Sequence, residues 1–377
     1  MKNDVNLQKK WSMRISVVVS FMGMFLSMIA TSFAQIGGKS VYQFLSFNNS
    51  STQAALGGSS LAMKESDLFL ATYNPSFLNP SLHTSIALNF TDYFSNASYG
   101  SLGYAHHFEK IGMFAFSLQT VGYGSFLQTD EMGNQLGNFT AGDYALTTSW
   151  GRQLDSSFSI GANLKLIYAG YESYHSFGLA VDVAGSYYNQ KKDIMLTLLV
   201  RNAGSQLKPF VTGSFEPLPF DIQLAFSQKL QHLPLRYHIS LHSLYKWNLV
   251  YVGENDPLLE KDGLTGEFKY PSQTSLFFDN FFRHFIFGIE ILPVKYLSFQ
   301  FAYNHQRRQE MKIPQKRSFA GFSYGFSLNI SAFQIGFSRA HFATGATPNY
   351  FTFAANINEL TKLSKQRKVK KLQRVNE

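Results

Sequence analysis

The sequence predicts a transmembrane antiparallel β-barrel of about fourteen strands, of the kind that crosses bacterial outer membranes. The first reason is composition: charged residues make up only 15% of the 377 residues, and aromatic residues make up 16%. The second is that apolar residues alternate with small or polar ones from Ile86 onward. The third is that no apolar run beyond residue 30 reaches the roughly 18 residues of a membrane helix. A barrel wall combines these features, because lipid-facing and lumen-facing residues alternate along each strand.

Residues 1–34 have the pattern of a secretory signal peptide. A basic start precedes an apolar run at 15–30, and small residues at Ser32 and Ala34 follow it. Cleavage between Ala34 and Gln35, after Sec export, is predicted. The alternative is an uncleaved anchor helix, but an apolar run of 16 residues is short for a membrane span.

The strands are recognised by their period of two. Between Phe158 and Tyr168, apolar residues alternate with Ser159, Gly161, Asn163 and Lys165, so the two sets lie on opposite faces of one strand. The second face is small or polar, which is typical of an apolar-out, polar-in barrel. This pattern predicts strands at 84–92, 97–107, 110–122, 142–152, 157–169, 174–188, 193–203, 219–230, 235–247, 284–292, 295–305, 320–330, 332–341 and 349–357.

The connections between these strands mostly alternate in length, although two on the side of the long loops, near Tyr93–Asn96 and Gly170–Ser173, are short. Those after every second strand are tight, whereas the loops at 123–141, 204–218, 248–283 and 306–319 are long. Outer-membrane barrels have short periplasmic turns and longer extracellular loops. The alternation therefore predicts an integral outer-membrane protein with both termini in the periplasm.

Two segments flank the predicted barrel at 84–357. Residues 35–83 are too irregular for a strand and too apolar for a disordered arm, so we expect them to form a plug or hatch inside the lumen. The tail at 358–377 carries a net charge of +5. It could be a solvated helix, a contact for acidic groups in the periplasm, or a disordered arm.

Charge and cysteine content exclude several classes of protein. The formal net charge is +9, but residues 1–14 hold +3 of it and the tail +5, which leaves +1 for the body. A nearly neutral body lacks the basic face that phosphate binding requires, so nucleic acid is excluded as a partner. The chain has no cysteine, which excludes disulfides, thiolate metal sites and lipoprotein-type acylation.

Residues Gly321–Gly325 match the G-x-S-x-G pattern of a hydrolase nucleophile elbow. An elbow needs a sharp turn from a strand into a helix. Here the alternation continues straight through Ser323, so we interpret the match as an ordinary strand.

His238 and His242 are four residues apart, which on a helix would suit a metal ion. On a strand this spacing separates them by about 13 Å. We therefore interpret both as polar residues of the lumen.

Four charged residues fall on the small or polar face of their predicted strands. They are Lys165, Asp182, Arg236 and Glu290. They could line a path for a solute, or pair with one another and with the plug. We favour pairing, because buried polar groups need partners.

Two long loops are candidates for binding a partner protein. The first contains Asp130, Glu131, Gly133 and Asn134. The second, at 248–283, is rich in large apolar residues, among them Phe268, Tyr270, Phe277 and Phe278. Exposed apolar clusters often mark binding surfaces. The alternative is that 277–282 extends the tenth strand and belongs to an aromatic girdle.

Several short segments carry a resemblance to a known family. They are the start at 37–45, the motifs Ala54–Gly58 and Tyr73–Pro75, the loop Asp130–Asn134 with 137–139, and the strand Gly161–Tyr168. Together they resemble the FadL-like superfamily of long-chain fatty-acid transporters and, more closely, the PorQ-like barrels of the Bacteroidetes type IX secretion system. The resemblance covers 35–360 and implies that Leu56, Gly57, Gly58, Tyr73, Asn74 and Pro75 belong to the plug.

The resemblance also implies a function. PorQ-like barrels belong to a cell-surface attachment complex with a PorU-like sortase, a PorV-like barrel and a PorZ-like surface protein, which joins secreted cargo to lipopolysaccharide. This chain would then anchor the PorZ-like partner in outer-membrane lipid, without catalytic residues, cofactor or metal. The alternative, from the broader superfamily, is a channel for hydrophobic solutes. Ser76 follows Pro75 where that superfamily usually has alanine, which weakens the analogy to a transport hatch.

Overall fold

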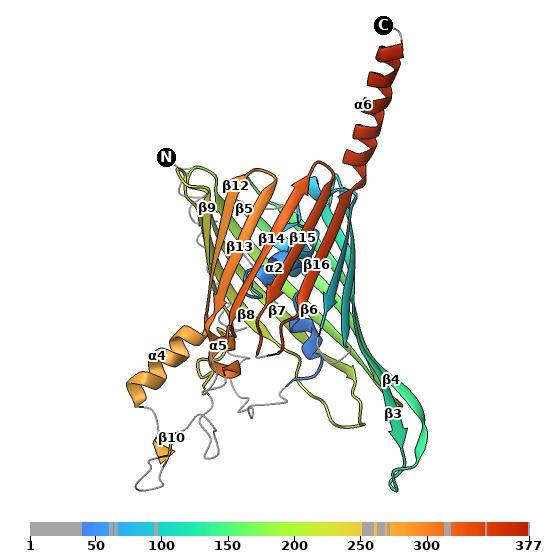
Figure 1. Cartoon of the computed structure of the whole chain (residues 1–377), viewed down its shortest axis with the longest axis vertical. Helices are drawn as coiled ribbons and strands as arrows, with labels where there is room; N and C mark the ends of the chain where they lie inside the picture. The colour runs from blue at the N-terminus through green and yellow to red at the C-terminus, as the bar shows by residue number, and fades with distance from the viewer. Residues whose placement is uncertain are drawn as a thin grey trace, which may run out of the picture. The chain divides into compact units, whose positions relative to one another are not determined.

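Fourteen of the strands close into an antiparallel barrel in which each strand pairs with its neighbours along the chain (Figure 1). The computed structural model describes residues 40–59, 63, 67–93, 97–250, 260–261, 268–269, 272–312, 318–343 and 345–375. The chain divides into two compact units, 1–39 and 40–377, and all described residues belong to the second. The predicted cleavage site at Ala34 and Gln35 lies outside the described residues, as does Tyr270.

All fourteen predicted strands are present, so the predicted fold class is confirmed. The barrel closes where β1 pairs with β16. The strands are β1 Ser85–Asp92, β2 Ser98–Phe108, β3 Gly112–Thr129, β4 Gln135–Gln153, β5 Phe158–Tyr171, β6 Tyr174–Asn189, β7 Ile194–Lys208, β8 Asp221–Lys229, β9 Leu235–Leu241, β12 Phe285–Val294, β13 Leu297–Asn304, β14 Phe322–Ile330, β15 Phe333–Ala340 and β16 Asn349–Asn356. Two further short strands, β10 Glu260–Lys261 and β11 Phe268–Lys269, pair with each other apart from the barrel.

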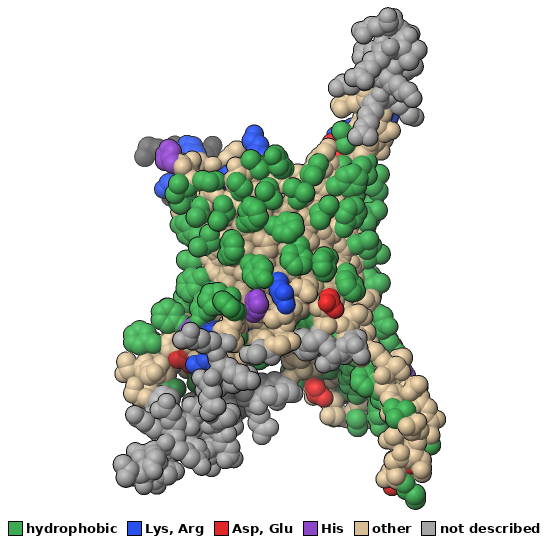
Figure 2. All heavy atoms as spheres, in the orientation of Figure 1, with side chains coloured by type: hydrophobic (Ala, Val, Ile, Leu, Met, Phe, Trp, Pro, Cys, Tyr) green, Lys and Arg blue, Asp and Glu red, His purple; other side chains and the backbone are tan. Residues whose placement is uncertain are grey.

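The outer face of the wall is apolar and the inner face is small or polar. In β1, Ile86, Leu88 and Phe90 are exposed while Ala87 and Asn89 are buried. Figure 2 shows hydrophobic side chains covering the visible face of the wall. A closed barrel satisfies every strand edge, and an apolar outer face suits lipid. No helix among the described residues is both long enough and apolar enough to cross a membrane.

The two ends of the barrel differ. One end, here called the turn end, carries the tight connections and the start of the C-terminal helix α6 Ile357–Val375. The opposite end, here called the loop end, carries the longer connections and the helices α4 Gln273–Arg283 and α5 His305–Met311 (Figure 1). The tail is helical over Ile357–Val375, so it is not the disordered arm among the three alternatives.

The predicted loop at 123–141 is mostly strand. β3 continues to Thr129 and β4 begins at Gln135, so that the two form a long hairpin. The register shifts between Gly122 and Ser125, where a bulge absorbs extra residues. Glycines around this bulge interrupt the alternation of apolar and polar residues, so the pattern did not predict the extension of the two strands.

The stretch 277–282 is not an extension of the tenth strand. It belongs to α4, and the following strand, β12, begins only at Phe285. Ser272 caps the helix, because its hydroxyl accepts a hydrogen bond from the Ser275 amide at 3.2 Å. The predicted ninth strand is also shorter than expected, since β9 ends at Leu241.

The N-terminal segment, which we define as the described residues between 40 and 82, lies inside the barrel (Figure 1). Its elements are η1 Gln43–Ser46, α2 Ser51–Ala55, α3 Leu68–Tyr73, η2 Pro75–Phe77 and η3 Pro80–Leu82. Short helices suit this place, because the surrounding wall leaves no free strand edge for pairing.

Candidate functional site

Polar contacts tie the N-terminal segment to strands around the barrel. The Ser76 and Ser186 hydroxyls lie 2.6 Å apart, which joins η2 to β6. The Asn163 amide of β5 donates to the Thr72 carbonyl at 2.8 Å. On other strands, Tyr73 donates to Gln223 of β8 at 3.0 Å, and the Ser51 amide donates to Thr352 of β16 at 2.8 Å. The segment is therefore held from several directions.

Apolar packing accompanies these bonds. Large side chains of the segment, including Leu68, Phe69 and Leu82, are 1% exposed. They pack against small inward-facing residues of the wall such as Ala87 and Ala115. Small wall residues therefore provide the volume that the segment fills.

Close approach of the segment to the wall requires glycine at Gly161. A Cβ atom built on this residue of β5 would overlap the carbonyl group of Pro75. Gly151 of β4 is in the same situation, since its Cβ would lie 2.6 Å from that of Leu78. The backbone of η2 thus lies directly on two neighbouring strands.

The residues predicted for the plug all lie in this buried segment. Leu56 is 2% exposed, and Asn74 is fully buried and caps η2. Gly57 and Gly58 have positive φ angles of 84° and 100°, which favour glycine. The Gly57 carbonyl accepts a hydrogen bond from the Asn304 amide at 3.2 Å. This turn connects the segment to the loop end of β13.

The charged lumen residues form two ion pairs, which confirms the predicted pairing. Lys165 Nζ lies 2.7 Å from Asp182 Oδ2, and Arg236 Nη1 lies 2.7 Å from Glu290 Oε2. Three of these four side chains are at most 5% exposed. Buried charges need such partners, and we find no sign that these four line an open path.

Asn202 joins the first of these pairs to a bulge in β7. Its side-chain oxygen accepts from Lys165 Nζ at 2.7 Å, and its amide donates to Asp182 Oδ1 at 2.7 Å. Its φ angle is 52°, and the register between β6 and β7 shifts at this point. The ion pair therefore fixes a strained backbone position that the sequence did not reveal.

The two histidines do not form a metal site. His238 is buried beside Glu290, with 3.9 Å between Nε2 and the carboxylate, while the His242 amide donates to the His284 carbonyl. Among the described residues, no group of three or more histidine, aspartate or glutamate residues could hold a metal ion.

Ser323 does not lie on a nucleophile elbow. It sits in β14, which runs from Phe322 to Ile330 without a turn into a helix, and its side chain is 2% exposed. The interpretation as an ordinary strand residue is therefore confirmed.

A polar cavity of about 400 Å³ lies at the loop end of the lumen. Its lining includes Arg201, Asp221, Gln223, Arg307 and Tyr350. The Arg201 guanidinium lies 3.9 Å from the centre of the Tyr73 ring. A channel for hydrophobic solutes would need a largely apolar lining, and this lining is rich in charged and amide groups.

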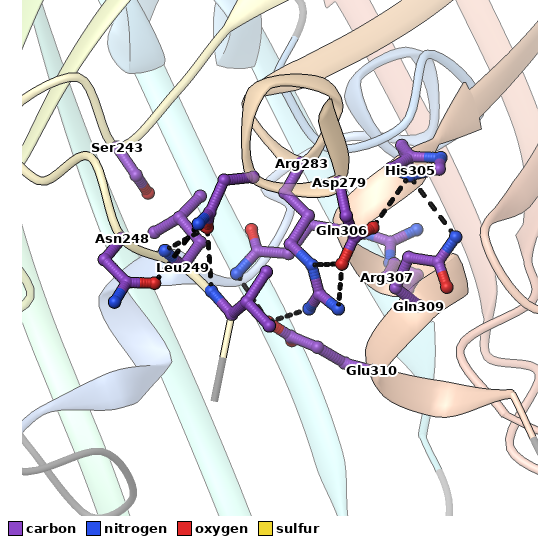
Figure 3. A network of polar contacts seen from close by, with 12 residues as sticks. Ser243, Asn248, Leu249, Asp279, Arg283, His305, Gln306, Arg307, Gln309 and Glu310 are labelled. Carbon is purple, nitrogen blue, oxygen red and sulfur yellow. Dashed lines mark hydrogen bonds and ion pairs between the residues drawn. The ribbon is translucent and has the colours of Figure 1, made fainter. Parts of the chain in front are cut away.

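A network of polar contacts holds α4 against α5 (Figure 3). Arg283 Nη2 lies 2.9 Å from Asp279 Oδ2 within α4, and His305 Nε2 of α5 lies 3.4 Å from Asp279 Oδ1. Asn280 accepts hydrogen bonds from the Leu249 and Val250 amides at 2.8 and 2.9 Å. The polar face of α4 is thereby fixed to the loop end.

The acidic groups of this network titrate differently. Burial opposes ionisation of Asp279, but the hydrogen bonds from His305 and Arg283 prevail and lower its pKa. Burial raises the pKa of Glu310, although a hydrogen bond from Gln306 opposes the shift. Asp279 is therefore the acidic group that stabilises the contact between the two helices.

The opposite face of α4 is aromatic and exposed. Phe277 and Phe278, both predicted to contact a partner, are 52% and 54% exposed, and Phe281 and Phe282 are 38% and 43% exposed. The backbone of Phe268 lies in β11. The polar half of this helix was not predicted from the sequence, although Asp279 and Arg283 have the spacing of a helical ion pair.

The predicted binding residues of the first loop form the tip of the β3–β4 hairpin. Asp130 accepts hydrogen bonds from the Met132 and Asn134 amides at 2.9 and 2.8 Å. The Asn134 side chain donates at 2.8 Å, and these bonds hold the Asp130 pKa below its usual value. Gly133 has a φ angle of 85°. Asp130 thus organises a turn that leaves Met132 89% exposed.

Comparison with known proteins finds similarity in architecture. No family model matches the chain, and no curated protein matches it. The toluene transporter TodX of Pseudomonas putida has a TM-score of 0.45 at 12% identity, over 82% of this chain and 96% of that chain. A FadL homologue of Pseudomonas aeruginosa has a TM-score of 0.42 at 11% identity, over 85% and 99%.

A third solved structure is less similar. The KdgM porin has a TM-score of 0.31 at 8% identity, over 72% of this chain and 98% of that chain. All three are barrel proteins to which this chain is similar at low identity. The similarities do not identify a ligand or an activity for this chain.

Proposed function

We propose that the protein is a non-enzymatic outer-membrane platform whose loop end anchors a surface protein. The N-terminal segment inside the lumen supports this proposal. The N-terminal segment is bonded to β5, β6, β8 and β16 and packs against small residues of the wall. A filled barrel is a rigid support, because the segment braces strands from inside.

The proposed docking surface is the β3–β4 hairpin. Its tip has a fixed turn around Asp130, and Met132 and Leu136 on it are 89% and 63% exposed. Methionine adapts to varied apolar partners. A preformed turn with exposed apolar side chains is a suitable contact for another protein, because little order must be created on binding.

The sequence resemblance supplies the finer part of the proposal. On this basis the partner is a PorZ-like surface protein of a type IX attachment complex that also contains PorU-like and PorV-like subunits and acts on lipopolysaccharide. Sec export and periplasmic termini are part of the same proposal. A periplasmic C-terminus requires the turn end, where α6 begins, to face the periplasm and the loop end to face outward. The first described residues lie at the loop end, where the Val41 amide donates to the Pro217 carbonyl at 3.0 Å.

The rival function is a channel for hydrophobic solutes. It would use the cavity at the loop end, which is lined by Arg201, Asp221 and Arg307. Binding an apolar solute there would leave charged groups without water, and this costs free energy. The platform is therefore the function that the geometry supports better.

Site-specific photo-cross-linking tests the proposal. A photoreactive amino acid at Met132 should cross-link to a surface protein in intact cells, and mass spectrometry would identify the adduct. The matched control is the same residue at Gln190, an exposed position in a tight connection at the turn end. Protein adducts from Gln190 but none from Met132 would contradict the proposed docking surface and its orientation.

A further inference from the structure

We propose that α4 is a membrane-interface helix, whose aromatic face lies in the boundary between lipid headgroups and acyl chains at the loop end. This inference concerns lipid contact and does not depend on whether a partner protein binds the hairpin. It follows from the orientation of the helix, from its continuity with the wall, and from the shortness of β9 beside it.

The orientation of α4 is the reverse of that in a soluble domain. Asp279, Asn280 and Arg283 point to the protein and are bonded to α5 and to residues 248–250. Phe277, Phe278, Phe281 and Phe282 form the other face. A helix that hides its polar side and exposes four aromatic rings is suited to an apolar environment.

The aromatic face continues directly into the lipid-facing wall. The rings of Phe281 and Phe285 are 4.9 Å apart, and those of Phe285 and Phe287 are stacked at 5.7 Å. Phe287 and Ile289 are exposed on the outer face of β12. In Figure 2 hydrophobic side chains extend from the wall to the region of α4. The apolar outer surface of the barrel therefore continues onto α4 at the end of the helix that leads into β12.

One strand beside α4, β9, is short. β9 has only 7 residues, whereas a membrane-crossing strand needs about 9–11. Residues after β9 replace it, since Leu244, Tyr245 and Trp247 are 41%, 47% and 51% exposed. The Trp247 ring lies 5.5 Å from that of Phe277. Tryptophan and tyrosine favour membrane interfaces, so this segment and α4 together complete the apolar band.

Spin labelling tests this inference directly. Because the chain has no cysteine, a single introduced cysteine is the only site that the label can modify. We would label Phe278→Cys and, separately, Phe282→Cys with a nitroxide and reconstitute the folded protein alone in phosphatidylcholine vesicles. Electron paramagnetic resonance would then compare collisions with oxygen, which concentrates in lipid, and with a water-soluble nickel chelate. Ile289→Cys on the outer face of β12 is the lipid control, and Met132→Cys at the hairpin tip is the water control.

The expected oxygen-to-nickel ratio at residue 278 or 282 is several-fold above that at residue 132 and closer to that at residue 289. A ratio equal to that at residue 132 would place the aromatic face in water and overturn the inference. Shielding from both reagents would show that a second copy of the chain covers the face, and would also overturn it. Heat-modifiable migration in gels confirms that each labelled variant is folded, and two positions guard against a local defect.

Discussion

Lys165 of β5 and Asp182 of β6 form an ion pair at 2.7 Å inside the barrel, and both contact Asn202 of β7. Three strands are thus joined at a bulge by one buried pair. Lys165 stands opposite Ala180, and Asp182 stands opposite Asn163, so the two charges are diagonal neighbours. This arrangement stabilises the part of the wall that surrounds the N-terminal segment.

Removing one partner of this pair should destabilise the barrel. Lys165→Ala leaves Asp182 charged and buried, which costs about 3–5 kcal/mol. The midpoint of urea unfolding, followed by heat-modifiable migration, should fall accordingly. The double variant Lys165→Ala with Asp182→Ala should recover much of the loss. A single variant as stable as the wild type would show that the pair does not form.

Glycine at Gly161 should be required by the N-terminal segment. Gly161→Ala places a methyl group against the Pro75 carbonyl, and overpacking of this kind costs about 1–3 kcal/mol. The control is Gly185→Ala on β6, where nothing lies within 4 Å of the added atom. Limited proteolysis should cut the N-terminal segment faster in the first variant only. Equal rates in both variants would mean that η2 does not rest on β5.

Charge on the outer face should impair assembly into the membrane. Phe299→Arg introduces a cation on the exposed face of β13, which costs about 2–4 kcal/mol near the bilayer midplane. The yield of heat-modifiable barrel in the outer membrane should fall. Met132→Arg at the exposed hairpin tip should leave the yield unchanged. An unaffected Phe299→Arg variant would mean that this face does not meet lipid.

Acid should release α4 from α5. The pKa of Asp279 is lowered in the folded protein by His305 and Arg283. A depressed carboxyl pKa contributes stability above the unfolded value, and this contribution is lost as the pH falls through the folded value. Protonation of Asp279 should therefore change the fluorescence of Trp247, which lies against Phe277 of α4, only below the ordinary aspartate pKa. A change at higher pH would come from Glu310, whose pKa is raised. Asp279→Asn should remove the transition at low pH, and an identical transition in that variant would assign it to another group.

The strands could be predicted from the sequence because each strand buries one face and exposes the other to lipid. That alternation does not depend on the partner strand, so all fourteen could be placed. The pairing of Lys165 with Asp182, by contrast, needs the register of β5 against β6. The position of the four charges on the polar face of their strands predicted that they would find partners, but not which ones.

The helix α4 could not be recognised for a physical reason. Its aromatic residues point away from the protein, so the usual inference that apolar residues face a core fails there. The hairpin extension at Ser125–Thr140 was hidden because a bulge breaks the period of two.

If the N-terminal segment closes the barrel, the protein supports a partner and does not conduct ions. Single-channel recording in planar lipid bilayers tests it most directly. The full chain should show no stable porin-like conductance, whereas a heat-modifiable variant lacking residues 40–82 should conduct. Sustained open-channel current through the unmodified protein would contradict this expectation. Such a current would require a continuous path past α2, α3 and η2, which lie inside the wall.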